Sequence, residues 1–292
     1  MWRLTKKTVT GWFRADVFEH AAALSYITLF SIAPTLLITV GLVAMVLGHK
    51  TAQSRVFQEI QDWIGPMGAQ TLQRMIQNAA LNKRDLVATL VGGFFFLLGA
   101  TAIFSQLKKV LNEIWSARPD PKRHSVLEFL RIRLISLVMV IVFGLFVLTT
   151  VLSSALLVSF GKLISAYLLI PLWVLRGINF VVSTSIIGLF FAMVFKFLPD
   201  IKIKWREVLP GALLTSFFFA AGKYLIALYI SQSHILNIYG ASGSLVVILV
   251  WVYYSSLIVF LGASFTQVYA TDYRERFGAP SSSQPIFSRN SS

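Results

Sequence analysis

The residue types that most often carry catalysis or bind metals are sparse in this sequence of 292 residues. Cysteine is absent, which excludes a disulfide framework, a thiolate nucleophile and a cysteine-bound metal. The four histidines, His20, His49, His124 and His234, lack the close spacing that would hold a metal ion. We therefore expect no catalytic residue, no metal ligand and no cofactor, in a protein that is not an enzyme.

Lys223 is the sharpest single signal, because it is an ionisable side chain inside the apolar run 208–230. A charge in hydrocarbon is costly, so such a residue is a candidate for a functional site. Lys223 stands roughly 10 Å from the end of this run at 1.5 Å per residue, so its stem could extend to the membrane interface. Two interpretations stay open: a structural or snorkelling lysine, and a lysine that faces a solute or a gate.

Pro34 lies within another apolar run, where it removes one backbone hydrogen bond and frees a carbonyl near Phe30 and Ser31. We expect a kink there, and the hydroxyls of Tyr26, Ser31 and Thr35 could bind a solute beside it. Helix packing is the alternative role for this proline. Arg176 is a further candidate for the solute path, with an interfacial anchor as its alternative role.

The amino-acid composition indicates the class of protein in which these candidate residues lie. Hydrophobic residues make up 56% of the chain and charged residues only 13%, whereas soluble domains usually carry about 25% charged residues. So large an apolar surface cannot be hidden in a soluble core of this size. We therefore expect a polytopic membrane protein whose main partner is the lipid bilayer.

Six apolar runs are long enough to cross a hydrocarbon layer, which takes about 20 helical residues. The predicted fold class is an all-α membrane protein with a bundle of six transmembrane helices. We place a cytoplasmic segment at 1–20, the transmembrane domain at 21–271 and a disordered cytoplasmic tail at 272–292. The predicted spans are about 21–48, 86–107, 134–160, 174–196, 208–230 and 240–268.

The net charge of +14 fits either nucleic-acid binding or membrane topology, and the position of the charges decides between them. With six spans and a cytoplasmic N-terminus, 18 Lys and Arg residues lie on the inner side and 7 on the outer side. A seventh span at 163–175 would erase this asymmetry, so we expect that segment to be interfacial or re-entrant. The prediction is a bacterial inner-membrane protein with both termini cytoplasmic and no nucleic-acid partner.

Between the first two spans, apolar residues recur at helical spacing on both sides of Gly65–Pro66. We expect two short amphipathic helices on the outer surface, divided at this dipeptide. Their predicted role is to cap the bundle, and binding of a partner is the alternative.

Small residues recur at intervals of four in the last two spans, and such stripes let helices approach closely. The residues are Ala212, Ser216 and Ala220 in one span and Gly262 and Thr266 in the other. Contact between these two helices is their predicted role. The sequence allows an oligomer but does not predict one.

Eight short motifs follow one another in a fixed order along residues 15–272. They are Ala23–Tyr26, Ser31–Pro34, Leu111–Trp115, Pro210–Ala212, Gly222–Lys223, Tyr239–Gly240, Trp251–Tyr253 and Leu261–Ala263. Their order and spacing resemble those of the bacterial YihY/BrkB inner-membrane family. This resemblance implies six transmembrane helices with cytoplasmic termini, in agreement with the charge count.

The resemblance also implies a choice of functions, since members are treated as transporters, as virulence factors or, by a label generally regarded as mistaken, as ribonuclease. Many relatives carry Glu where this chain has Ser264, and we count Ser264 among the candidates for the solute path. No carboxylate is left in the predicted spans, and their only charge is basic. We expect transport or export of a small anionic or zwitterionic solute or an amphiphile. A non-enzymatic envelope scaffold is the alternative, and ribonuclease activity is not expected.

Overall fold

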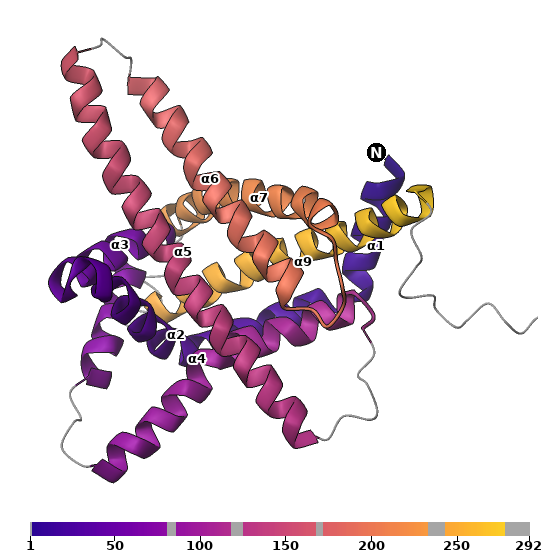
Figure 1. The fold of residues 1–292 in the computed structure, drawn as a ribbon, viewed down its shortest axis with the longest axis horizontal. Coiled ribbons are helices and arrows are strands. Elements are labelled where there is room, and N and C mark those ends of the chain that lie inside the picture. Colours follow the sequence, from indigo (N-terminus) through magenta and orange to yellow (C-terminus); the bar gives the residue numbers. More distant parts are fainter. Residues whose placement is uncertain (1, 81–85, 118–124, 168–171, 233–242, 278–292) are drawn as a thin grey trace, which may run out of the picture.

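The computed structural model describes residues 2–80, 86–117, 125–167, 172–232 and 243–277, and all regular structure in these ranges is helical (Figure 1). The expected all-α class is confirmed. The helices are α1 (Trp2–Arg14), α2 (Val17–Leu47), α3 (His49–Ala80), α4 (Leu86–Ile114), α5 (Ser125–Tyr167), α6 (Leu172–Phe197), α7 (Trp205–Gln232) and α9 (Gly243–Phe277).

Four stretches of helix within the described residues are long and apolar enough to cross a membrane. They are Val17–Leu47, Leu130–Ser153, Phe180–Phe197 and Leu245–Glu275, and they overlap the first, third, fourth and sixth predicted spans. The other two predicted spans, 86–107 and 208–230, lie within α4 and α7. Many large apolar side chains, including Phe30 and Met45, are exposed on the outside of the helices. An apolar surface of this extent is suited to lipid.

Two residues with positive φ mark the ends of α2. Asp16 has φ 42° and ψ 40°, so the chain turns between α1 and α2, and α1 then lies beside the end of α9 (Figure 1). Gly48 has φ 77°, which favours glycine because a side chain would be strained there, and its N–H donates to the carbonyl of Ala44 at 2.9 Å. The first predicted span, 21–48, therefore corresponds to one helix, which ends just before Gly48.

Helix α3 differs from the two short helices predicted between the first two spans. It is one helix that continues through Gly65 and Pro66. Proline removes one backbone hydrogen bond from a helix, but apolar residues on both sides of the dipeptide, including Val56 and Leu72, are buried in the same cluster. Packing along both halves therefore outweighs the local tendency to break.

Segment 163–175, predicted to be interfacial or re-entrant, is divided between two helices. Its first residues continue α5 to Tyr167, and its last residues begin α6 at Leu172. Residues 168–171 lie outside the described part of the chain, as does most of the predicted disordered tail, from 278 to 292.

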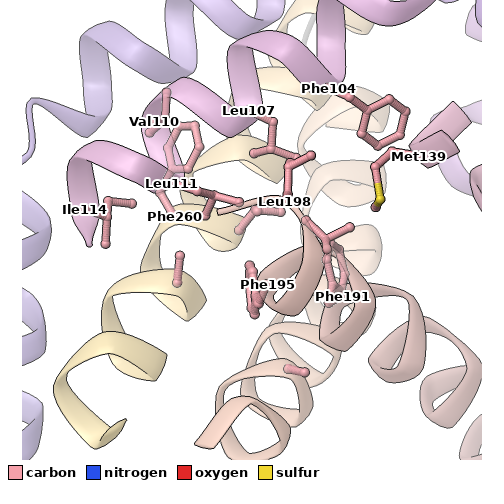
Figure 2. Packing of buried hydrophobic residues seen from close by; sticks show 14 of the residues in the cluster. Phe104, Leu107, Val110, Leu111, Ile114, Met139, Phe191, Phe195, Leu198 and Phe260 are labelled. Atoms are coloured by element: carbon pink, nitrogen blue, oxygen red, sulfur yellow. The ribbon is translucent and has the colours of Figure 1, made fainter. Parts of the chain in front are cut away.

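The buried apolar residues form two clusters, which we call the first core and the second core. In the first core, Phe104 and Leu107 of α4 lie near Phe191 and Phe195 of α6, together with Met139 of α5 (Figure 2). The second core joins α2, α3, α5 and α9 through residues that include Leu36, Ile60, Phe146 and Val252. Helices far apart in sequence therefore share both cores.

Helices α7 and α9 meet through a reciprocal Gly–Thr contact, in which each helix presents a glycine to a threonine of the other. A methyl group added at Gly211 would overlap the hydroxyl of Thr266, and one added at Gly262 would overlap that of Thr215. Each threonine hydroxyl donates to the carbonyl of the glycine four residues earlier in its own helix, at 2.7 Å. The two backbones can approach closely because both glycines lack a side chain.

The small residues of α7 thus contact two neighbouring helices, α9 and α6. Gly262 and Thr266 face α7 as expected, but their partners are Gly211 and Thr215. Ser216 instead lies against Gly188 of α6, where an added methyl group would come within 3.2 Å of its hydroxyl. Ala212 is buried in the first core, and Ala220 is partly buried. A shift of one residue turns a helix by about 100°, so adjacent stripes face different helices.

We expect Gly262→Ala to lower the free energy of unfolding by about 1–3 kcal/mol, because the new methyl group must displace Thr215. Gly41→Ala is the matched control, since an added methyl group there meets no atom within 4 Å. Unfolding in mixed detergent micelles, followed by circular dichroism, measures both. Adding Thr215→Ala should restore part of the loss, and equal stability of the two glycine variants would contradict the contact.

Candidate functional site

A cavity of about 230 Å³, partly open to the outside, lies within the bundle where the first and second cores meet. Its walls come from α2, α3, α4, α5, α6, α7 and α9. Leu24 and Leu36 mark its extent along α2, and Trp251 and Val259 mark it along α9. Sites for small molecules are usually concave and mostly apolar, with a few polar groups. This cavity is therefore the candidate functional site.

Three kinds of side chain line the cavity. Seven are aromatic: Phe104, Phe143, Phe146, Phe190, Phe191, Phe219 and Trp251. Four carry hydroxyls: Thr28, Thr35, Ser255 and Ser256. The remaining lining residues are Leu, Ile or Val, and no charged residue lines the cavity within the described part of the chain.

Three of the hydroxyls in the lining donate hydrogen bonds to backbone carbonyls of their own helices. Thr28 donates to the carbonyl of Leu24 at 2.6 Å, Thr35 to that of Ser31 at 2.8 Å, and Ser256 to that of Val252 at 2.7 Å. Such bonds to the carbonyl four residues earlier satisfy a hydroxyl without a partner helix. These three groups keep lone pairs that can accept a hydrogen bond, but the proton of each is engaged.

Pro34 packs α2 against α4 beside the cavity. An added methyl group at Gly99 of α4 would lie 3.2 Å from Cγ of Pro34, and the Thr35 hydroxyl lies 3.3 Å from the carbonyl oxygen of Ala100. The proline ring therefore occupies the space that a glycine leaves on the facing helix. This contact fixes the wall residue Thr35 between α2 and α4.

One end of the bundle, which we call the polar end, gathers the beginnings of α2, α5 and α7 with the ends of α4, α6 and α9. His20 Nε2 of α2 lies 3.0 Å from Glu113 Oε2 of α4. Arg131 Nη2 of α5 lies 3.4 Å from Oδ1 of Asp200, in the turn after α6. These two contacts join the beginning of α2 to the end of α4 and the beginning of α5 to the turn after α6.

Asp200 is the central acceptor at the polar end. Nζ of Lys108, a side chain only 2% exposed, lies 2.9 Å from its Oδ1. Asn112 donates to Oδ2 at 2.8 Å and accepts the backbone N–H of Asp200 at 2.8 Å. A buried ammonium needs a counter-charge, because its transfer from water costs several kcal/mol. Lys108 directly follows the cavity residue Leu107, so this ion pair lies beside the cavity wall.

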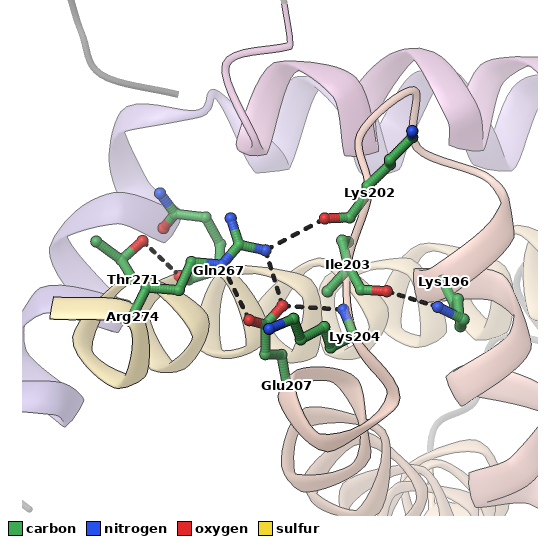
Figure 3. A network of polar contacts seen from close by, with 8 residues as sticks. All are labelled: Lys196, Lys202, Ile203, Lys204, Glu207, Gln267, Thr271 and Arg274. Atoms are coloured by element: carbon green, nitrogen blue, oxygen red, sulfur yellow. Dashed lines mark hydrogen bonds and ion pairs between the residues drawn. The ribbon is translucent and has the colours of Figure 1, made fainter. Parts of the chain in front are cut away.

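Glu207 and Arg274 join the beginning of α7 to the end of α9 (Figure 3). Arg274 donates from Nε to Oε1 at 2.9 Å and from Nη2 to Oε2 at 2.7 Å, a bidentate geometry that strengthens the pair. The backbone N–H of Lys204 donates to the same carboxylate at 3.0 Å. Nearby, Nζ of Lys196 donates to the carbonyl of Ile203 at 2.6 Å. The 1% exposed Glu207 is thus fully engaged.

The pKa of Glu207, which precedes the predicted span 208–230, lies below its usual value. Burial opposes ionisation and would raise this pKa, but hydrogen bonds from Arg274 and from the backbone of Lys204, with their positive charges, lower it. A carboxyl group whose pKa falls on folding stabilises the folded state above its unfolded pKa. That contribution is lost as the pH falls through the folded pKa.

Among the predicted candidates for the solute path whose side chains the structure describes, Thr35 lines this cavity, whereas Tyr26, Ser31, Pro34 and Ser264 do not. Tyr26 is 64% exposed and contacts Phe30 edge to face, with ring centroids 5.1 Å apart. Ser31 is buried in α2, and Pro34 packs against Gly99. Ser264 is buried in α9, and its hydroxyl has no hydrogen-bond partner among the described residues.

Lys223 and Arg176 lie within α7 and α6, but their side chains fall outside the described part of the structure. Next to Lys223, Gly222 contacts α9, because an added methyl group would overlap the ring of Tyr254. The role of Lys223 stays a prediction.

Sequence reasoning did not find the cavity. Thr28 and Thr35 stand seven residues apart, which places them on one helix face, and Ser255 and Ser256 interrupt an apolar run. These hydroxyls were the available signal. It was weak, because hydroxyl residues in membrane helices also bond to their own backbone without lining any cavity.

Long apolar helices, an apolar outer surface and charges gathered at one end define a helical membrane protein. The chain belongs to the family described as Virulence factor BrkB, whose sequence model matches residues 8–286. The resemblance inferred from the motifs is therefore confirmed.

Similar proteins are named UPF0761 membrane protein. One from Vibrio vulnificus is 28% identical over 250 residues, which cover 85% of this chain and 76% of the relative. One from Vibrio campbellii is 29% identical over 250 residues, with the same coverage. One from Pseudoalteromonas translucida is 27% identical over 259 residues, which cover 86% of this chain and 80% of the relative. No solved structure gives a significant match.

We expect Glu207→Gln to lower the free energy of unfolding by about 3 kcal/mol at pH 7, because Arg274 loses its buried counter-charge. The difference from the unchanged protein should shrink below about pH 4, where carboxyl groups take up protons. Glu275→Gln, at an exposed position of α9, is the control and should have little effect. Unfolding measured from pH 7 to pH 3 tests this, and a difference independent of pH would contradict it.

Proposed function

We propose that this protein is a non-enzymatic transporter or exporter of a small amphiphile in the bacterial inner membrane. The observation that supports the proposal is the cavity, which lies between the two cores and is bordered by helices from the whole bundle. A site in the middle of a helical bundle is typical of transporters. The proposal requires no cofactor, no metal ion and no nucleic acid.

We also propose six membrane spans with both termini in the cytoplasm. The polar end supports this topology, because ion pairs link the beginnings of α2, α5 and α7 to segments at the ends of α4, α6 and α9. The excess of Lys and Arg in the segments assigned to this side, 18 against 7, matches the positive-inside rule. In this topology the polar end faces the cytoplasm.

The polar end is also suited to closing the cavity on that side. The buried Lys108, next to the wall residue Leu107 in the chain, pairs with Asp200, which is exposed to solvent, and Glu207 with Arg274 fastens α7 to α9. An inward opening would have to separate helices that these pairs hold together. Alternating access by rocking of helices is the general mechanism of such proteins.

Labelling of single cysteines tests the topology, and the chain offers a background free of native cysteine. In intact cells a membrane-impermeant maleimide should label Ser54→Cys, at an exposed position of α3. Ser291→Cys, near the C-terminus, should be labelled only after the cells are made permeable. Labelling of both positions in intact cells, or the reverse pattern, would contradict cytoplasmic termini.

Flux from proteoliposomes tests the transport function. With a panel of fluorescent amphiphiles, the protein should accelerate efflux of at least one member about fivefold or more over protein-free liposomes, a change of roughly 1 kcal/mol in the barrier. Val252→Phe should abolish this flux, because Val252 lines the cavity, whereas Val181→Phe, on the exposed face of α6, should not. A folded protein that moves none of the panel would favour the scaffold alternative.

A further inference from the structure

We propose that the cavity binds an uncharged aromatic group of about the size of one substituted ring, and that it rejects anions. This inference deepens the transport function proposed above, on which it rests, because it names the chemical class of the group that the cavity holds. It also departs from the anionic or zwitterionic solute expected from basic residues in the sequence.

The volume of the cavity sets the size of the guest. An engineered apolar cavity of about 150 Å³ in another protein stays free of water and binds benzene. The present cavity, at about 230 Å³, is larger by roughly one half and is lined mainly by aromatic and aliphatic side chains. It therefore has room for one substituted ring, but not for a whole lipid.

The aromatic side chains of the lining form a continuous series of ring contacts. Phe146 and Phe190 stack with centroids 4.7 Å apart, and Phe190 contacts Phe191 at 5.6 Å. Phe191 meets Phe219 edge to face at 5.6 Å, and Phe219 meets Trp251 edge to face at 5.8 Å. The series runs from α5 through α6 and α7 to α9. It offers both faces and edges of rings, the two geometries in which a further aromatic ring is stabilised.

Three of the four hydroxyls in the lining offer no proton to an anion. Thr28, Thr35 and Ser256 donate their protons to backbone carbonyls, and Ser255 is the fourth. An anion needs donors or a positive charge to replace the water that it loses, and without them its burial costs several kcal/mol. Almost all of the surface that the described lining presents to a guest belongs to apolar atoms, which suits a neutral aromatic ring.

Among the cations whose side chains the structure describes, the two nearest to the cavity along the chain are engaged elsewhere. Lys108 follows the wall residue Leu107, but its ammonium pairs with Asp200 at 2.9 Å. Lys196 lies two residues beyond the wall residue Val194, but it donates to the carbonyl of Ile203 and lies 5.3 Å from the ring centroid of Trp205. Neither is free to neutralise an anionic guest in this conformation.

Photolabelling of the full chain in lipid nanodiscs tests the inference. The probe is 3-trifluoromethyl-3-phenyldiazirine, a small neutral aromatic compound, and mass spectrometry locates the label. Labelling of the peptides that contain Phe190 and Trp251 should saturate and fall at least tenfold with excess methyl benzoate. Benzoate, almost the same size but anionic, should leave it unchanged. Labelling at the exposed Phe30 and Met45 should rise without saturation and resist both competitors.

Matched variants separate the cavity from the lipid-facing surface. Val252→Phe should reduce the saturable labelling at least fivefold, while Val181→Phe should leave it unchanged. The competition experiment on the unchanged protein stands even if Val252→Phe does not fold. Labelling that never saturates at Phe190 and Trp251, or equal competition by benzoate, would overturn the inference. Saturable labelling without flux would overturn the transport function alone, and flux without saturable labelling would overturn this inference alone.

Discussion

The absence of water within a bilayer is the constraint on which this structure depends, because every polar group there must find its partner within the chain. Along α2, the hydroxyls of Ser25, Thr28, Thr35 and Thr39 donate to carbonyls four residues earlier. Charged side chains instead pair with one another near the beginnings and ends of helices, as Lys108 does with Asp200. The middle of the bundle is thus left with apolar and aromatic side chains and with hydroxyls most of which are bonded, Ser264 being an exception among the described residues.

Close helix contacts then decide where space remains. The reciprocal Gly–Thr contact brings α7 and α9 together, and Pro34 fills the space beside Gly99 between α2 and α4. The first core lies toward the polar end and the second core involves α3, so bulky rings such as Phe146 and Phe190 meet at the boundary between them. Rings of this size and rigidity leave unfilled volume where helices cross at different angles. The cavity is a product of the same packing that stabilises the bundle.

The sequence predicted the fold class and most helix positions, because hydrocarbon thickness demands long charge-free runs and these can be counted directly. It did not predict which face of a helix meets which neighbour. Thr215 and Ser216 are adjacent, yet Thr215 lies against Gly262 of α9 and Ser216 lies against Gly188 of α6. Nor did it predict the continuous α3, because packing along its length outweighs the effect of Gly65–Pro66. The cavity could not be predicted for a related reason. Its described walls come from seven helices, and no local sequence pattern shows how these helices pack together.

The volume of the cavity depends on the position of helix α3. Ile60 and Leu72 belong to the connection between the first two long apolar helices, yet both form part of the wall. A tilt of this one connecting helix would enlarge or shrink the space for a guest while α2, α5 and α9 stayed where they are. An antibody fragment that binds the exposed side of α3, outside the bundle, would therefore restrict the volume that the cavity offers to a guest.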